Sequence, residues 1–177
     1  TGEFEAIRFR GGSGDEHAFL EERIAWERKL GLAGWTCVGW PREHGGQARP
    51  MSYLLILLEE LATAGAPFGP LSGCLQVSDS IIRNGSEPLQ REILPLVARG
   101  DATFWQGYSE PDAGSDLLAL NTRARLEGDH WVLNGTKTYI TNGCEGFCFL
   151  VYAKVDGKVT AFVVDREAFY DILFQSL

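Results

Sequence analysis

The chain has 177 residues, of which 45% are hydrophobic and 23% are charged, and its formal net charge is −8. A chain of this length can bury a substantial core, as one domain or two small ones, and the composition is ordinary for a globular protein. The acidic balance argues against a nucleic-acid partner, because the scattered Lys and Arg residues cannot assemble a basic face.

Two further sequence features bear on location and on metal binding. The longest fully apolar run, residues 54–58, is far too short to span a bilayer, and no signal peptide opens the sequence, so we expect a cytoplasmic protein with no membrane partner. Four cysteines are present, and only Cys144 and Cys148 lie close together. No second Cys pair or nearby His completes a zinc set, which favours ordinary thiols over a redox pair and predicts no metal site.

The first half of the chain is predicted to be helical. Residues 1–14 contain a Gly-rich, linker-like stretch and are predicted to form a flexible tail, and residues 15–102 a helical domain. Ser86 is a good N-cap and Gly100 a good C-terminal stop for the last helix, which Pro95 is expected to kink. The apolar spacing predicts helices over residues 17–32, 51–63, 71–83 and 89–98.

After Gly100 the pattern changes to short β-rich runs separated by Gly-Asp, Asn-Gly and Asp-Gly turns. Residues 103–165 are therefore predicted to form a middle β domain, an antiparallel sheet or barrel, with Trp105 and Trp131 facing its interior. Residues 166–177 are predicted to form a short amphipathic helical tail. The fold class is α+β, with strands expected over residues 103–108, 120–126, 130–133, 137–141, 147–154 and 158–164.

Two segments contain most of the residues that suggest chemistry. Residues 106–116 read Gln-Gly-Tyr-Ser-Glu-Pro-Asp-Ala-Gly-Ser-Asp, and residues 130–143 read His-Trp-Val-Leu-Asn-Gly-Thr-Lys-Thr-Tyr-Ile-Thr-Asn-Gly. A small-residue turn near Ser115 can bring backbone N–H groups close to an anionic or carbonyl group. Ser109 and Thr141 offer hydroxyl groups, and Tyr139 offers an aromatic plane. Such groups could orient a flat cofactor ring, although a plain β-turn shaped by Ser109, Gly114 and Ser115 is the alternative.

These two segments resemble the signature sequences of the acyl-CoA dehydrogenase family. Residues 40–46 and 94–100 are similar to that family's helical N-terminal domain, so the resemblance extends over about residues 20–165. Tyr108 departs from the pattern, since the family usually has an aliphatic residue there, and Tyr139 replaces the commonest Trp. The two tyrosines suggest a substrate bulkier or more polar than a plain fatty acyl chain.

The resemblance implies an FAD site with defined contacts. Main-chain atoms of residues 106–108 and the side chains of Ser109, Tyr139 and Thr141 would contact the flavin. Ser115 would touch the FAD phosphates or the acyl-CoA substrate. Glu110 is interpreted as a support for the turn and not as a catalytic base. The full set of expected FAD-contacting residues is Gln106, Gly107, Tyr108, Ser109, Gly114, Ser115, Tyr139, Ile140 and Thr141.

The implied activity is the oxidation of an acyl-CoA thioester to the 2,3-enoyl thioester, with an electron-transfer flavoprotein as electron acceptor. Family members are about twice as long, and a C-terminal helical bundle usually supplies the catalytic base. The catalytic residue here is therefore unknown, and we expect little or no activity from this chain alone. An incomplete flavin site and an apolar tail also predict a homo-oligomer or hetero-oligomer.

Three other functions remain open at this stage. The chain could be a non-catalytic subunit that contributes half a flavin site to a partner. It could belong to the flavin monooxygenases or nitroalkane oxidases, which share the architecture. It could also be a folded remnant that binds no ligand.

Overall fold

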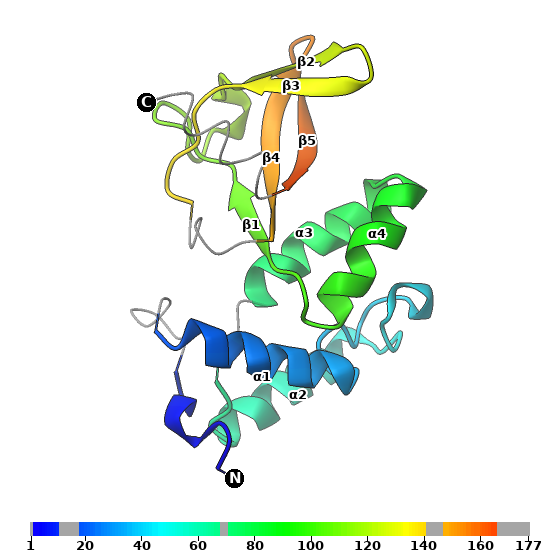
Figure 1. Ribbon diagram of the computed structural model, residues 1–177, viewed down its shortest axis with the longest axis vertical. Coiled ribbons are helices and arrows are strands. Elements are labelled where there is room, and N and C mark those ends of the chain that lie inside the picture. Colours follow the sequence, from blue (N-terminus) through cyan, green and yellow to red (C-terminus); the bar gives the residue numbers. More distant parts are fainter. Residues whose placement is uncertain (1, 11–17, 68–70, 141–146, 166–177) are drawn as a thin grey trace. The chain divides into compact units, whose positions relative to one another are not determined.

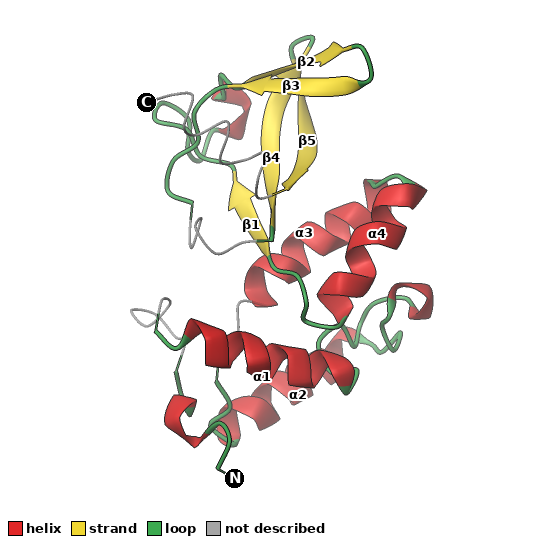
Figure 2. Ribbon diagram, in the orientation of Figure 1, coloured by secondary structure: helices red, strands yellow, loops and turns green. Residues whose placement is uncertain are grey.

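The computed structural model describes residues 2–10, 18–67, 71–140 and 147–165, without the side chains of residues 71–76. The chain divides into two compact units, residues 1–103 and residues 104–177. In the described residues the first unit is helical and the second contains all of the β-strands, which confirms the α+β class (Figures 1 and 2).

The described part of the first unit contains four α-helices. Helix α1 begins at Leu20, because Phe19 has a left-handed backbone conformation (φ 53°) that a helix cannot include. Helix α4 begins where the Ser86 hydroxyl accepts a hydrogen bond from the Leu89 amide, as the sequence predicts, and it continues through Pro95. The helices are α1 (Leu20–Leu32), α2 (Met51–Thr63), α3 (Leu71–Asn84) and α4 (Glu87–Ala98).

Helix α1 approaches the end of α4 closely. A Cβ on Gly31 would lie 2.3 Å from the backbone carbonyl carbon of Arg99, so only glycine fits at this position. The hydroxyl of Thr36, a few residues after α1, donates to the Ala98 carbonyl at 2.6 Å. These contacts hold α1, the loop that follows it and the end of α4 together.

The N-terminal segment packs on this helical unit. Residues Glu5–Ile7 form a 3-10 turn, and the side chain of Ile7 is 1% exposed. The ring of Phe4 packs edge-on against Trp26 of α1, with the ring centroids 5.2 Å apart. The sequence predicts a flexible tail here because of its glycines, whereas the described part of the segment is anchored by apolar contacts.

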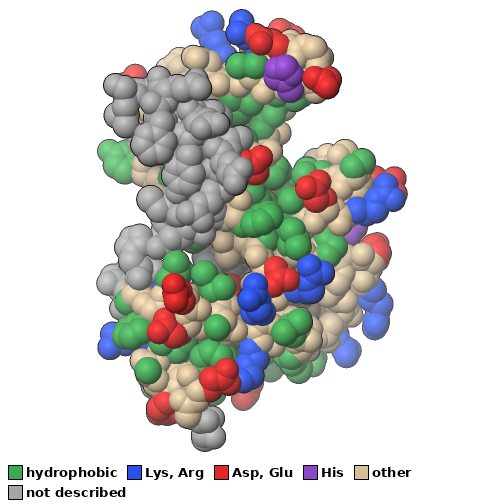
Figure 3. All heavy atoms as spheres, in the orientation of Figure 1, with side chains coloured by type: hydrophobic (Ala, Val, Ile, Leu, Met, Phe, Trp, Pro, Cys, Tyr) green, Lys and Arg blue, Asp and Glu red, His purple; other side chains and the backbone are tan. Residues whose placement is uncertain are grey.

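Helix α2 is strongly apolar and yet contains no buried residue. Its exposed large side chains are Met51, Leu55, Ile56 and Leu58. Hydrophobic side chains also lie among the charged ones on the face of the helical unit drawn in Figure 3. A run of this kind is unusual on the surface of an isolated domain.

The second unit is a five-stranded mixed sheet. Among the described strands, β4 lies at the centre, with β5 along one side and β1 and β2 one after the other along the opposite side, and β3 pairs with β2. The strands are β1 (Phe104–Gly107), β2 (Arg123–Glu127), β3 (His130–Asn134), β4 (Cys148–Val155) and β5 (Lys158–Asp165), and a 3-10 turn covers Leu117–Ala119.

The sheet is mixed because two of its pairings are parallel. The hairpins β2–β3 and β4–β5 are antiparallel, as their turn sequences predict. However, β1 runs parallel to β4, with Phe104 opposite Cys148 and Gly107 opposite Val151, and Arg123 of β2 pairs with Lys154 in the parallel sense. The expectation of a purely antiparallel sheet is corrected for the β1–β4 and β2–β4 pairings. Long connections, and not hairpins, join the strands of these two pairs.

The core of the sheet unit contains one of the two tryptophans expected to face inward. Trp105 is buried in a cluster with Phe149, Val151 and Val164. Trp131 is 44% exposed, because β3 lies at the edge of the sheet, and its ring packs edge-on against Phe162. The inward orientation predicted for Trp131 is therefore wrong.

Within the described residues, no helix combines the length and the apolar character needed to cross a bilayer. No group of three or more His, Cys, Asp or Glu side chains is arranged to hold a metal ion in that part of the chain. Cys37 and Cys148 are buried, and burial raises the pKa of the Cys37 thiol to about 12.

Candidate functional site

The site begins where strand β1 ends. Gln106 and Gly107 are the last residues of β1, and the chain then turns through Tyr108 and Ser109, which are both partly buried. Among the described strands, β1 pairs only with β4, so it lies at an edge of the sheet. The signature segment therefore leaves the sheet from an edge strand, although the residues of that strand are buried or partly buried.

A tight turn follows at Glu110. The Glu110 amide donates to the Ala113 carbonyl at 2.8 Å, and the Ala113 amide donates back to the Glu110 carbonyl at 3.2 Å. Gly114 and Ser115 lie just beyond this turn and are exposed. A Cβ on Gly114 would meet no atom within 4 Å, so the packing of the chain itself does not require glycine there.

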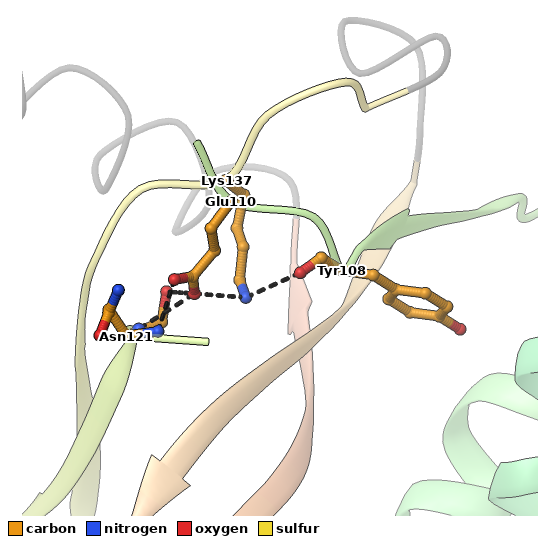
Figure 4. Close-up of polar contacts among 5 residues, drawn as sticks. Tyr108, Glu110, Asn121 and Lys137 are labelled. Atoms are coloured by element: carbon orange, nitrogen blue, oxygen red, sulfur yellow. Dashed lines mark hydrogen bonds and ion pairs between the residues drawn. The ribbon is translucent and has the colours of Figure 1, made fainter. Parts of the chain in front are cut away.

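The carboxylate of Glu110 is buried at the centre of a polar network (Figure 4). Oε1 accepts hydrogen bonds from the Thr122 amide at 3.0 Å and the Thr122 hydroxyl at 2.5 Å, and Oε2 accepts from the Asn121 amide at 2.5 Å. Lys137 Nζ lies 2.9 Å from Oε1, and both side chains of this ion pair are 4% exposed. The same Nζ also donates to the Tyr108 carbonyl at 3.1 Å.

This network keeps Glu110 ionised. Burial alone raises the pKa of the carboxyl group, but the hydrogen bonds from Lys137, Thr122 and Asn121 outweigh it and lower the pKa to about 2. A carboxylate with all of these donors is neither free nor basic enough to abstract a proton. The structure therefore gives Glu110 the supporting role that the sequence interpretation assigns to it.

The second segment lies beside the first. The Thr138 amide donates to the Ser109 carbonyl at 2.8 Å, so residues 137–138 are bonded to residues 108–110 by both side chain and backbone. The described residues 137–140 form no strand, in contrast to the sequence prediction, because Lys137 turns inward and Tyr139 has a left-handed backbone conformation (φ 55°).

Tyr139 and Ile140 point in opposite senses. The side chain of Tyr139 is 92% exposed, whereas Ile140 is partly buried and packs against the Trp105 cluster. A fully exposed aromatic ring on a backbone conformation that is unfavourable for a bulky residue is a marker of function more often than of stability. Thr141, the remaining predicted contact in this segment, lies outside the described residues.

Tyr108 directs its ring away from the Glu110 network, as Figure 4 shows. It packs edge-on against Tyr152 of β4, with ring centroids 4.9 Å apart. Burial, with smaller contributions from the neighbouring Tyr152, raises the pKa of Tyr108 to about 12. Tyr108, which stands where the family usually has an aliphatic residue, thus packs against a specific residue of the sheet.

The structure brings together the predicted contacts from β1 and Tyr139, and it adds two residues that the sequence interpretation missed. Lys137 and Thr138 join the two segments, although a lysine in a polar stretch is normally expected to face solvent. The only signal for them was their position inside the second motif. Ser115 and Gly114 remain separated from this contact by the turn at Glu110.

The arrangement fits a flat, hydrogen-bonding ligand such as a flavin. It offers the exposed ring of Tyr139 and, in the same segment, a buried Thr138 hydroxyl that has no hydrogen-bond partner among the described residues. The edge strand β1 and the Ser109 hydroxyl lie on the neighbouring segment. In FAD enzymes the protein supplies orientation and electrostatics of this kind, while the cofactor supplies the redox chemistry.

Family models identify the two units. The acyl-CoA dehydrogenase N-terminal domain matches residues 13–101, and the acyl-CoA dehydrogenase middle domain matches residues 106–169. The helical unit and the mixed sheet thus correspond to the N-terminal and middle domains of one family. The chain belongs to the acyl-CoA dehydrogenase family.

Curated relatives and solved structures agree with this assignment. Acyl-CoA dehydrogenase IpdE1 of Mycobacterium tuberculosis is 43% identical over 144 residues, which cover 78% of this chain and 36% of that protein. The Tcur3481-Tcur3483 steroid ACAD has a TM-score of 0.77 at 30% identity, over 93% of this chain and 43% of that chain. The ChsE4-ChsE5 complex of Mycobacterium tuberculosis has a TM-score of 0.75 at 31% identity, over 84% and 40%.

Some of these relatives are solved with the cofactor. An acyl-CoA dehydrogenase of Bacillus anthracis complexed with FAD has a TM-score of 0.68 at 29% identity, covering 86% of this chain and 26% of that chain. The chain spans about 40% of the length of most of the relatives that it matches.

Proposed function

We propose that this chain supplies the N-terminal and middle domains of an FAD-dependent acyl-CoA dehydrogenase. The reaction is the oxidation of the bond between the α and β carbons of an acyl-CoA thioester, with an electron-transfer flavoprotein as the eventual electron acceptor. The observation that supports it most directly is the bonding of the Ser109 segment to the Tyr139 segment, which gathers predicted flavin contacts from distant parts of the sequence.

The roles that we propose for the chain's own residues come from the family resemblance. The Ser109 hydroxyl and the backbone of Gln106 and Gly107 would hydrogen-bond the edge of the isoalloxazine ring, and the Tyr139 ring would lie against its face. When bound, a flavin supplies the group that takes up a hydride from the β-carbon. Ser115, exposed beyond the turn, would contact the FAD phosphates or the acyl-CoA chain.

The same reaction needs a carboxylate to remove the α-proton. Glu110 does not qualify, because it is 5% exposed and its oxygens are taken up by the Lys137 network. We therefore propose that the base comes from outside this chain, and that the chain alone has little or no dehydrogenase activity.

The acyl group is proposed to be bulky. Tyr108 and Tyr152 place two half-buried aromatic rings beside the end of β1, a surface that suits a ring-containing or more polar group better than a plain fatty acyl chain. One similar structure is a steroid ACAD, which supports a ring-containing acyl group such as a steroid side-chain thioester.

FAD titration of the purified chain tests this proposal. We expect quenching of flavin fluorescence and a visible oxidised-flavin spectrum that remains with the protein after gel filtration. A protein that stays colourless at saturating FAD would contradict flavin binding by this chain alone. Oxygen consumption by the reduced, flavin-loaded protein without any acyl-CoA would instead favour a monooxygenase or nitroalkane oxidase.

A second function is favoured by a specific observation, namely that solved relatives are complexes of two different chains. In this alternative the chain is a non-catalytic subunit that contributes half a flavin site to a partner. The apolar surface of α2 supports a partner, because none of its residues is buried. Co-expression with candidate full-length subunits tests it: a stoichiometric complex that binds FAD more tightly than either chain would support this role.

A further inference from the structure

The strongest unassigned feature of the site is the buried ion pair between Glu110 and Lys137. The two residues are 27 positions apart, and the pair lies between the segments that present Ser109 and Tyr139. A buried ion pair is not by itself a device for stability, because removing two charges from water offsets much of their attraction. Its position therefore calls for another explanation.

The ammonium group of Lys137 donates to two acceptors in the signature segment. Nζ donates to the Glu110 carboxylate at 2.9 Å and to the Tyr108 carbonyl at 3.1 Å. Glu110 in turn accepts from the Asn121 and Thr122 amides, which precede strand β2. The signature turn is thereby tied to the sheet on one side and to the Tyr139 segment on the other.

The backbone next to Lys137 completes the connection. The Thr138 amide donates to the Ser109 carbonyl at 2.8 Å, so adjacent carbonyls, those of Tyr108 and Ser109, each accept from adjacent residues of the second segment. Two bonds between the same pair of segments fix both their separation and their register. The exposed ring of Tyr139 then has a defined position relative to the Ser109 hydroxyl.

We propose that Lys137 is a positioning residue: through Glu110 and the Tyr108 carbonyl it holds the Ser109 and Tyr139 segments in the register that a flavin ring requires. This inference rests on the proposed function, because it assumes that both segments contact FAD. Lys137 itself does not touch the cofactor. It acts by restricting the geometry of groups that do, as supporting side chains around binding sites commonly do.

The test compares four variants of the same chain. K137M removes the donors while keeping the length of the side chain, and K137R retains the charge. Since K137M leaves the Glu110 carboxylate buried without its counter-charge, the double variant E110Q/K137M removes both charges and guards against misfolding. K158M, at an exposed lysine of β5, is the matched control.

Two readouts are measured on each variant. Amide hydrogen exchange, without ligand, follows the Thr138 amide against the amides of the β4–β5 pairing. FAD titration gives the dissociation constant of the folded protein. We expect K137M and the double variant to exchange Thr138 faster while β4–β5 stays protected, and to bind FAD about tenfold more weakly or worse. K137R should recover part of both effects, and K158M should change neither.

Other outcomes overturn the inference. Unchanged Thr138 exchange together with unchanged FAD affinity in the folded double variant would show that Lys137 does not position the site. A lower melting temperature with wild-type affinity and wild-type Thr138 exchange would reduce the ion pair to a purely stabilising contact. If the wild-type chain binds no FAD, the proposed cofactor binding by this chain fails, and the exchange measurement alone then decides whether Lys137 holds the two segments together.

Discussion

Tyr108 and Tyr152 pack edge to face, with their ring centroids 4.9 Å apart and their planes at 70°. Burial, helped by the nearby Tyr152, raises the pKa of Tyr108 from its ordinary value of 10 to about 12. The folded protein therefore keeps this proton to a higher pH than the unfolded chain does. Since the unfolded chain releases it first, the associated stability is present below pH 10 and is lost as the pH rises toward 12.

We predict that Tyr108→Phe makes the free energy of unfolding fall less steeply over that alkaline range. Urea unfolding at several pH values above neutrality provides the measurement. Leu118→Ala is the control, because that exposed side chain carries no titratable group, and it should leave the slope unchanged. Identical alkaline slopes for the wild type and Tyr108→Phe would contradict the prediction.

A second prediction concerns acid. The hydrogen bonds to Glu110 hold its pKa at about 2 despite burial, against an ordinary value of 4.5. A lowered pKa stabilises the fold above the unfolded value, and this stability is lost as the pH falls from 4.5 toward 2, by roughly 3 kcal/mol in total. Glu110→Gln should abolish most of this acid dependence while lowering stability at neutral pH. Urea unfolding between neutrality and acid measures both effects, and an unaltered acid slope would speak against the buried ionised state.

The close approach of α1 to the end of α4 leads to a third prediction. Gly31→Ala would place a Cβ 2.3 Å from the Arg99 backbone, and neither backbone can move without disturbing its helix. We expect a loss of about 2–4 kcal/mol in the free energy of unfolding. Thermal and urea unfolding measure the loss. Leu32→Ala, at an exposed neighbouring position, should cost far less, and equal effects of the two changes would disprove the steric argument.

Tyr139 should matter for ligand binding and hardly at all for stability. Its side chain has few contacts to lose, so Tyr139→Ala should change the free energy of unfolding by no more than about 0.5 kcal/mol. Loss of the stacking surface should weaken FAD binding by about tenfold. Paired unfolding and fluorescence titrations separate the two effects. A large destabilisation without any change in affinity would reverse this interpretation of the residue.

Helix α2 gives the fifth prediction. Because Leu55 and Ile56 are exposed on an apolar helix without any buried residue, we expect the chain to self-associate or to require a partner. Replacing both by Glu should reduce the mass measured by light scattering at high concentration and leave the helical circular dichroism unchanged. Leu118→Glu, at an exposed leucine of the other unit, is the control. A wild-type chain that remains monomeric at high concentration would exclude self-association.

The helices and hairpins were predictable because their signals are local. Ser86 caps α4 within three residues, and the Gly128 and Gly157 turns lie inside the hairpins that they join. The strand predicted over residues 137–141 failed for the opposite reason. Alternating β-rich residues favour a strand, but the bonds from Lys137 and Thr138 to residues about 28 positions earlier hold the backbone in another conformation.

In the candidate site, too, features set by the local sequence were predictable, whereas features set by strand pairing were not. Ser109 and Tyr139 were predicted as contacts because their motifs are recognisable in the sequence. The burial of Lys137 and the exposure of Trp131 were not, since both depend on which strands become neighbours and which strand lies at an edge. Parallel pairing of β1 with β4 has no signal in any turn between them.

That parallel pairing also affects how the second unit folds. The β2–β3 and β4–β5 hairpins connect residues close in sequence and can form early, whereas joining Phe104 to Cys148 must close a long loop first. The strand that carries Gln106 and Gly107 is therefore expected to dock late. A ligand that binds at this edge would bind only molecules in which β1 has already docked. The fraction of protein that retains the cofactor would therefore depend on the fraction that is completely folded as well as on the affinity of the site.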